Sequence, residues 1–302
     1  MREIRPSGSM RGEMRTWSGC GRKPSSSPYS IYGKYCQIFD APLSCGSGEW
    51  FLWEFPFSFW LEMNGYDVTY ISNLDTHLEA GGLSRGRGFL SIGHDEYWTI
   101  EMFRNAQAAL AAGVNFGFFS GNAVCGRVVY SPESQSFERV GVFGPPSGTR
   151  EFQHMSSLAH ERPYANELVG AHSTGPVTGG ADWVCALAQH WIYEGTGMVQ
   201  GEGIPGLIGW EWHGDPAPIP GLEIVASCPT QSASGRLNRE LHTATVYPGP
   251  GGNFVFNAGT CWWADGLSSP PGYVRPKVYT EPLGPDRRVQ RITQNIPSKM
   301  RE

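Results

Sequence analysis

The sequence predicts an α/β protein with a parallel sheet that is covered by helices on both faces. Residues 89–92 and 114–119 are short apolar runs that predict two strands, and residues 99–112 between them carry apolar side chains at helical spacing. A β-rich run at residues 66–72 comes before them. The order strand, crossover, strand, helix, strand is typical of a parallel sheet that is buried on both faces.

Two predicted helices carry recognisable start and stop signals. Residues 49–64 are amphipathic and rich in aromatic side chains, which we interpret as core, and Pro56 either begins the regular helix or kinks it. In the helix at 99–112, Thr99 can cap the N-terminus, and Gly113 stands where a left-handed C-cap belongs.

The C-terminal half predicts further strands and a closing helix. Residues 130–180 have little periodicity and predict no element, whereas residues 181–184 and 191–193 indicate short strands or buried turns. The remaining expectations are a strand at 222–226, a hairpin of 243–247 with 254–257, and a helix at 286–295.

Composition divides the chain into a basic extension and one domain. Residues 1–28 carry several arginines and few large apolar side chains, so they cannot bury enough surface to fold alone. They are either a solvated tail or a docking arm for an acidic partner. Nothing in the composition marks a linker farther on, so residues 29–302 are predicted to form a single α/β domain.

Charge and hydropathy exclude several classes of function. The net charge of -5 and the pI of about 5.9 give no basic footprint for nucleic acid, and no motif that reads RNA or DNA is present. No apolar run approaches the roughly 20 residues that span a bilayer, and the N-terminus lacks the apolar core of a signal peptide, so we expect a cytoplasmic protein without membrane partners. The 7 cysteines, widely spread and without a C-x-x-C pair, predict neither a disulfide framework nor a zinc ribbon.

Polar side chains follow all three predicted strands. Asp75 lies in the turn after the first strand, the run from His94 to Trp98 follows the second, and Asn122 follows the third. Ligands of open parallel sheets bind outside the carboxyl ends of the strands, where these three segments converge. The sequence therefore predicts a site at this edge of the sheet, and residues 204–215 form a second dense polar stretch, from which Glu211 is expected to join it.

Several segments resemble, in the same order, the catalytic-domain motifs of the N,N-dimethylformamidase large (β) subunit and its relatives. The resemblance covers roughly residues 30–296. It rests on Trp53-Glu54-Phe55-Pro56-Phe57, Gly93-His94-Asp95-Glu96-Tyr97-Trp98, Phe118-Phe119-Ser120-Gly121-Asn122, Glu194-Gly195-Thr196-Gly197, Ile204-Pro205-Gly206-Leu207, Gly209-Trp210-Glu211 and Arg288-Val289-Gln290-Arg291.

The resemblance implies a flavodoxin-like fold of the class I glutamine amidotransferase kind, with the C-terminal hairpin as an addition. It also implies hydrolysis of a small linear amide at a mononuclear iron (Fe3+), and a small partner subunit; a homo-oligomer is a further alternative. Tyr97 matches the tyrosine of a His-x-Glu-Tyr motif, and Glu211 matches the acid of a Gly-aromatic-Glu motif, so both are the expected iron ligands. Relatives tend to read Tyr-Trp or Trp-Trp where this chain has Cys125-Gly126, so a second tyrosine ligand at that place would be missing.

The candidate catalytic and metal residues each keep an alternative role. The phenol of Tyr97 ionises near neutrality only beside a strong positive charge such as Fe3+, and otherwise it is a buried tyrosine with a satisfied hydroxyl. Glu211 is a ligand or the partner of an arginine. His94 and Glu96 act as a general base and as support for the ligands, or they stabilise the N-terminus of the helix at 99–112. Asn122 donates to a developing oxyanion, or it is a turn residue with positive φ.

Asp75, Trp98, Trp210 and His213 are the expected substrate-binding residues. The tryptophans would line a small and mostly apolar pocket, and His213 is either a proton shuttle or a structural residue. Arg127 is the only cation beside the three motifs, so the sequence favours a short neutral amide over glutamine.

Two other functions stay open. In the first, Cys125 is a nucleophile like that of glutamine amidotransferases, although a nucleophile elbow would sit at the strand end, at Ser120. A buried inert thiol is the alternative for Cys125. In the second, the protein is a degenerate relative whose rim binds a small polar ligand without turnover, and the Cys125-Gly126 departure is the observation that favours it.

Overall fold

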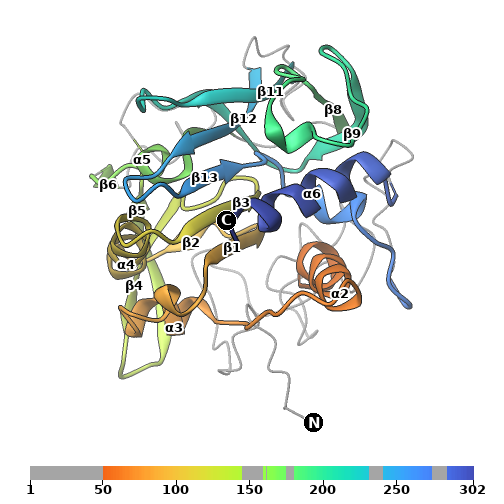
Figure 1. The fold of residues 1–302 in the computed structure, drawn as a ribbon. Helices are drawn as coiled ribbons and strands as arrows, with labels where there is room; N and C mark the ends of the chain where they lie inside the picture. Colours follow the sequence, from red (N-terminus) through yellow and green to blue (C-terminus); the bar gives the residue numbers. More distant parts are fainter. Residues whose placement is uncertain (1–49, 145–158, 161, 175–179, 231–240, 274–283) are drawn as a thin grey trace.

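A mixed five-stranded sheet forms the centre of the molecule (Figure 1). The computed structural model describes residues 50–144, 159–160, 162–174, 180–230, 241–273 and 284–302, and the predicted extension at 1–28 lies outside them. The sheet has the order β1 (Gly88–Gly93), β3 (Asn115–Ser120), β13 (Phe254–Asn257), β12 (Leu241–Pro248) and β11 (Glu223–Pro229). The first three strands are parallel, and β12 runs antiparallel to both of its neighbours.

Helices cover both faces of this sheet, as the sequence predicts. Successive side chains of β3 point to opposite faces: Phe116 and Phe118 belong to one core cluster, and Phe119 belongs to another. Helix α4 (Ile100–Ala111) fills the first cluster, whereas α2 (Phe55–Met63) and α6 (Arg287–Lys299) fill the second (Figure 1).

The helix ends agree with the local signals in the sequence. The Thr99 side chain accepts a hydrogen bond from the Met102 amide at 3.1 Å, and Gly113 after α4 has φ of 95°. Pro56 lies in the first turn of α2, so it begins the regular helix after a π-helical turn at Trp50–Glu54.

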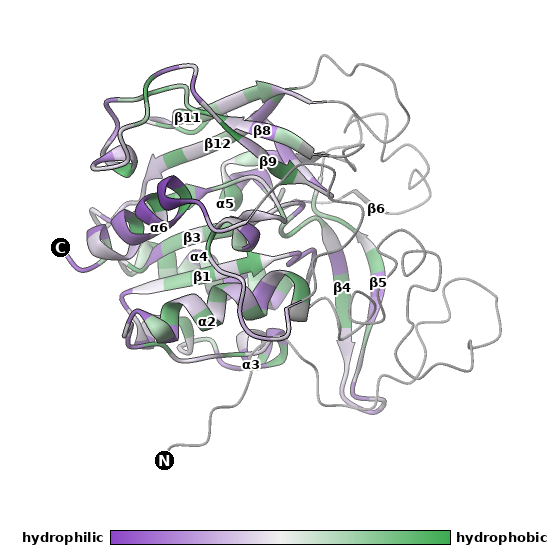
Figure 2. Ribbon diagram, turned by 90° about the vertical axis from the view of Figure 1, so that its right-hand side faces the viewer, coloured by the Kyte–Doolittle hydropathy of each residue, from purple (hydrophilic) through white to green (hydrophobic). Residues whose placement is uncertain are grey.

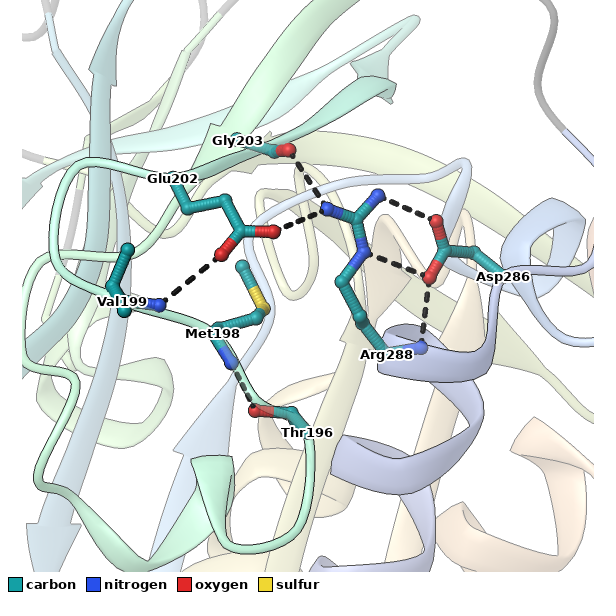
Figure 3. A network of polar contacts seen from close by, with 7 residues as sticks. All are labelled: Thr196, Met198, Val199, Glu202, Gly203, Asp286 and Arg288. Carbon is teal, nitrogen blue, oxygen red and sulfur yellow. Dashed lines mark hydrogen bonds and ion pairs between the residues drawn. The ribbon is translucent and has the colours of Figure 1, made fainter.

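A network of polar contacts around Arg288 joins α6 to the segment before β9 (Gly203–Gly209), as Figure 3 shows. The guanidinium of Arg288 lies 2.7 Å from Asp286, the N-cap residue of α6, and 2.8 Å from Glu202. Glu202 precedes β9, which pairs with β8 (Gly180–Val184). The network therefore joins the C-terminal helix to the β8–β9 hairpin.

A second sheet lies beside the central one and carries part of the polar rim. Its order is β2 (Tyr97–Trp98), β4 (Gly126–Ser131), β5 (Ser136–Val142) and β6 (Ala159–His160). The hairpin of β4 and β5 extends away from the body of the protein with alternating polar and apolar residues (Figure 2). The other described elements are η2 (Trp50–Glu54), α3 (Asn73–Leu78), η3 (Leu83–Arg85), α5 (Asn166–Val169), β7 (Ala171–Thr174) paired with β10 (Trp212–Pro216), η5 (Trp191–Tyr193) and η6 (Trp263–Gly266).

Two expectations about the fold are wrong. The segment 66–72 forms no strand: Tyr66 and Val68 pack on the core, and Ser72 becomes the N-cap of α3. The sheet is not wholly parallel, because the predicted C-terminal hairpin is no addition: β13 pairs directly with β3 in the middle of the sheet. Residues 130–180, where the sequence allowed no element to be placed, include β5, α5 and β7, and β4 ends at Ser131.

The α/β class holds, and the finer flavodoxin-like arrangement stays a prediction. Within the part of the chain that the structure describes, no helix has the length and apolar character needed to cross a membrane.

Candidate metal centre and active site

Three ionisable side chains from two distant segments meet at the carboxyl end of the parallel strands. His94 Nε2 lies 2.5 Å from Glu211 Oε2 and 3.4 Å from Glu96 Oε2. The ligand atoms of these three residues all lie within 4.8 Å of one another, and their side chains are 8–15% exposed. One imidazole and two carboxylates at this separation can hold a single cation.

Unusual backbone conformations place these side chains. Gly93 ends β1 with φ of 76°, and a Cβ at this residue would lie 2.8 Å from the Cβ of Trp53. The turn that carries His94 can therefore approach Trp53 closely, and the indole meets the imidazole edge-on at 5.7 Å. On the other side Trp210, with φ of 63°, turns the chain between β9 and β10 and leads into Glu211.

Tyr97 and Arg139 complete the surroundings of Glu96. Hydrogen bonding with Tyr97 lowers the pKa of the Glu96 carboxyl. Arg139 Nη2 lies 3.6 Å from Glu96 Oε1, and its Cζ lies 5.4 Å from the centroid of the Tyr97 ring. Arg139 comes from β5. Arg127 was the only cation that the sequence suggested near the site, so Arg139 was not predicted.

Asn122 reaches the cluster from the end of β3. Its Nδ2 donates to Glu211 Oε2 at 2.8 Å, and its φ of 50° shows the turn conformation considered for it. The turn also needs Gly121, because a Cβ at that residue would collide with the carbonyl oxygen of Glu211. The amide of Asn122 is therefore fixed against one of the two carboxylates.

His213 holds the Asn122 turn from behind. Its Nε2 accepts a hydrogen bond from the Ala123 amide at 3.1 Å, so its Nδ1 carries the proton and donates to Asn257 Oδ1 at 2.6 Å. Burial lowers the pKa of His213 to about 4. With 0% exposure and both nitrogens engaged, His213 is structural and does not face a substrate, in contrast to its predicted binding role.

Burial is the main influence on the carboxyl groups. Desolvation raises the pKa of Glu96, and the charge of Glu211 adds to it, while His94, Arg139 and Tyr97 act in the opposite direction. Desolvation also raises the pKa of Asp95, which points into the protein and accepts from Ser91 Oγ at 2.9 Å and Asn73 Nδ2 at 3.3 Å. Asp95 lies inside the polar run but had no predicted role. Its contacts with Ser91 and Asn73 could not be predicted from the sequence.

Cys125 is a buried thiol close to the same carboxylates. Desolvation raises its pKa well above the ordinary value, and the charges of Glu96 and Glu211 raise it further. Because the thiolate is the nucleophilic form, this environment disfavours the cysteine-hydrolase alternative. It agrees with the inert-thiol interpretation.

Three other predicted substrate-binding residues have other surroundings. Asp75 is exposed, and its carboxylate accepts from the Ser72 amide at 2.8 Å in the cap of α3. Trp98 is fully buried in the core cluster of α4, so it cannot line an accessible pocket. Trp210 is half-buried and packs on the aromatic cluster beneath His94 that includes Trp53 and Trp262, so of the set it is the one that stays beside the site.

The donor set fits a first-row transition metal such as iron. Imidazole nitrogen suits iron and zinc, and carboxylate and phenol oxygens add the hard donors that favour a trivalent ion. His94, Glu211 and Glu96 supply the nitrogen and the carboxylates. Tyr97, the residue after Glu96, offers a phenol.

Fold and site together define an α/β protein with a half-buried histidine–glutamate cluster at the carboxyl end of its parallel strands. The chain belongs to the family described as N,N-dimethylformamidase beta subunit-like, C-terminal, whose model matches residues 17–277. The family's name points to an amidase-type hydrolase and to one subunit of a larger enzyme. No curated protein matches the chain.

Proposed function

We propose that this protein is an iron-dependent hydrolase of small linear amides, which converts an amide and water to an amine and a carboxylic acid. The observation that carries the proposal is the convergence of His94, Glu96 and Glu211, with Asn122 hydrogen-bonded to Glu211. Family membership supports the reaction class.

Each side chain has a role that its contacts favour. Glu211 and Tyr97 are the proposed iron ligands, with His94 Nε2 as a third donor, and the bound ion would supply Lewis acidity toward the amide carbonyl. Glu96 is the general base, because a carboxyl whose pKa is raised by burial accepts a proton from water and returns it to the leaving amine. Asn122, held by Glu211, orients the substrate amide and donates to the carbonyl oxygen as charge develops there.

A compact neutral amide is the proposed substrate. Arg139 brings a positive charge to the site, but the carboxylate of Glu96 lies 3.6 Å from it and the ring of Tyr97 lies under it. The guanidinium therefore balances a charge of the protein itself. A substrate carboxylate would also meet the negative charge of Glu211.

Metal analysis with matched variants tests the proposal. We expect iron in the purified protein and hydrolysis of formamides in a panel of short amides that also includes glutamine. Glu211→Gln and Tyr97→Phe lower both iron content and activity, whereas Glu138→Gln and Tyr130→Phe on the β4–β5 hairpin are the controls that change neither.

The alternatives correspond to distinct outcomes of the same panel. Ammonia release from glutamine alone would contradict the proposed substrate. A folded protein with background iron that binds a short amide without turnover would replace the hydrolase by a binding module. Because the family is named for a β subunit, we extend the proposal to a small partner subunit, and sedimentation of the chain alone separates this from a homo-oligomer.

A further inference from the structure

The ring of Tyr97 lies in a space that Gly126 leaves open. The two residues are paired in register between the parallel strands β2 and β4, and the Gly126 amide donates to the Glu96 carbonyl at 2.8 Å. A Cβ at Gly126 would lie 2.6 Å from Cδ1 and 2.8 Å from Cε1 of the Tyr97 ring. Real Cβ contacts are essentially never this short, so a side chain at residue 126 would displace the ring.

The backbone conformation does not require a glycine at residue 126. Gly126 does not have a positive φ, so an L-residue can adopt the same conformation. The aromatic ring is the nearest atom group to the added Cβ, ahead of the Glu96 carbonyl oxygen at 3.5 Å. In this chain the close approach of the Tyr97 ring to β4 therefore depends on Gly126.

Arg139 lies over the face of the same ring. Its Cζ is 5.4 Å from the ring centroid, within the distance at which a guanidinium is attracted to an aromatic face. Its Nη2 is also 3.6 Å from Glu96 Oε1. One guanidinium, with its side chain 17% exposed, thus contacts both Tyr97 and Glu96.

We propose that Gly126 and Arg139 are positioning residues that together fix the Tyr97 ring beside Glu96. Gly126 lets the ring lie against β4, and Arg139 keeps the ring and the carboxylate at a fixed separation. The effect on catalysis rests on the proposed function, in which Tyr97 is an iron ligand and Glu96 is the general base. The placement of the ring can be measured without metal or substrate.

The test follows the Tyr97 phenol directly in protein labelled with [ζ-13C]tyrosine. The resonance of Tyr97 is assigned as the one missing in Tyr97→Phe. We expect it to move in Gly126→Ala and in Arg139→Gln, while the other tyrosine resonances keep their positions. Gly81→Ala is the control for the glycine variant, because a Cβ at Gly81 meets nothing within 4 Å. Arg85→Gln, on an exposed ion pair, is the control for the arginine variant.

Affinity for Fe3+ and amide hydrolysis give the functional readout. Residues that orient metal ligands typically change metal affinity or activity about 10- to 100-fold when they are replaced, and we expect losses of this size in Gly126→Ala and Arg139→Gln. Arg139→Lys keeps the charge but loses the planar guanidinium, so it restores part of the loss. In a Tyr97→Phe background, Arg139→Gln causes a smaller further loss than in the native protein, because its effect passes through the phenol.

The outcomes separate this inference from the proposed function. An unmoved Tyr97 resonance in both variants overturns the positioning roles, whatever the activity. If the resonance moves but the protein has neither iron nor amidase activity, the positioning of Tyr97 holds and its catalytic role is wrong. If Gly126→Ala fails to fold, Arg139→Gln and Arg139→Lys carry the same test.

Discussion

Acidification is expected to destabilise the protein through two fully buried histidines. His213 and His242 have 0% exposure, and burial lowers their pKa values from 6.5 to about 4 and about 3. His213 is engaged at both nitrogens, and His242 Nε2 donates to the Ala258 carbonyl at 3.1 Å. Both histidines are therefore neutral in the folded protein. Their hydrogen bonds link β10 and β12 to the end of β13.

The sign and size follow from proton linkage. Below pH 6.5 the unfolded chain binds a proton at each histidine and the folded protein does not, so the stability falls as the pH falls, until the folded pKa is reached. Between pH 7 and pH 5 each histidine costs about 2 kcal/mol, or about 4 kcal/mol together. This is a large part of the roughly 5–15 kcal/mol that stabilises a typical domain.

Buried carboxyl groups act in the opposite direction. Asp95 and Glu96 have raised pKa values, so the folded protein binds their protons before the unfolded chain does, and acid stabilises it through them. The pH dependence of the native protein alone therefore mixes the two effects. Comparison with histidine variants isolates the histidine contribution.

Urea unfolding at pH 7, 6 and 5 measures the effect. Between pH 7 and pH 5 the free energy of unfolding falls for the native protein and for both variants. We expect the fall to be about 2 kcal/mol smaller in His242→Gln and in His213→Gln than in the native protein. His77→Gln is the control, because its ring packs on Tyr130 and Phe137 instead. An equal fall in the native protein and in both buried-histidine variants would refute the reasoning.

Three further substitutions have outcomes that the structure predicts. Gly121→Ala places a Cβ against the Glu211 carbonyl and 2.9 Å from the Cys261 amide, so thermal unfolding should show a loss of about 3 kcal/mol and a displaced Glu211 should reduce amidase activity. Cys125→Ser should keep at least a tenth of the native kcat, and loss of all activity in a folded variant would favour the cysteine nucleophile. Arg288→Met removes the guanidinium that joins Asp286 to Glu202, so it should lower the free energy of unfolding measured in urea. An unchanged free energy of unfolding would show that this network does not stabilise the protein.

Local signals in the sequence predicted the elements whose ends are fixed by neighbouring residues. Thr99 and Gly113 bound α4 as expected, because capping and left-handed conformations depend on one or two residues. The strands at 88–93 and 115–120 were also predicted, because both are short apolar runs. The convergence of the polar segments after these two strands followed from their parallel direction, whereas the third predicted segment, with Asp75, follows no strand.

Long-range pairing decided what these local signals could not. The run at 66–72 has the composition of a strand, but its side chains pack on the core without a ladder, and β13 takes the place beside β3. The β4–β5 hairpin is only partly buried and mixes charged and polar residues with apolar ones, so the sequence shows little strand periodicity there.

The candidate site divides in the same way. The sequence by itself determined the residue types: a histidine, two glutamates and a tyrosine in segments typical of the formamidase family. Only the tertiary structure decided their partners. It brought Glu211 to within 2.5 Å of His94 across more than a hundred residues and placed Arg139 over Tyr97, while it turned His213 into the core. Such contacts depend on how separate strands stack, and this information is not contained in any one segment.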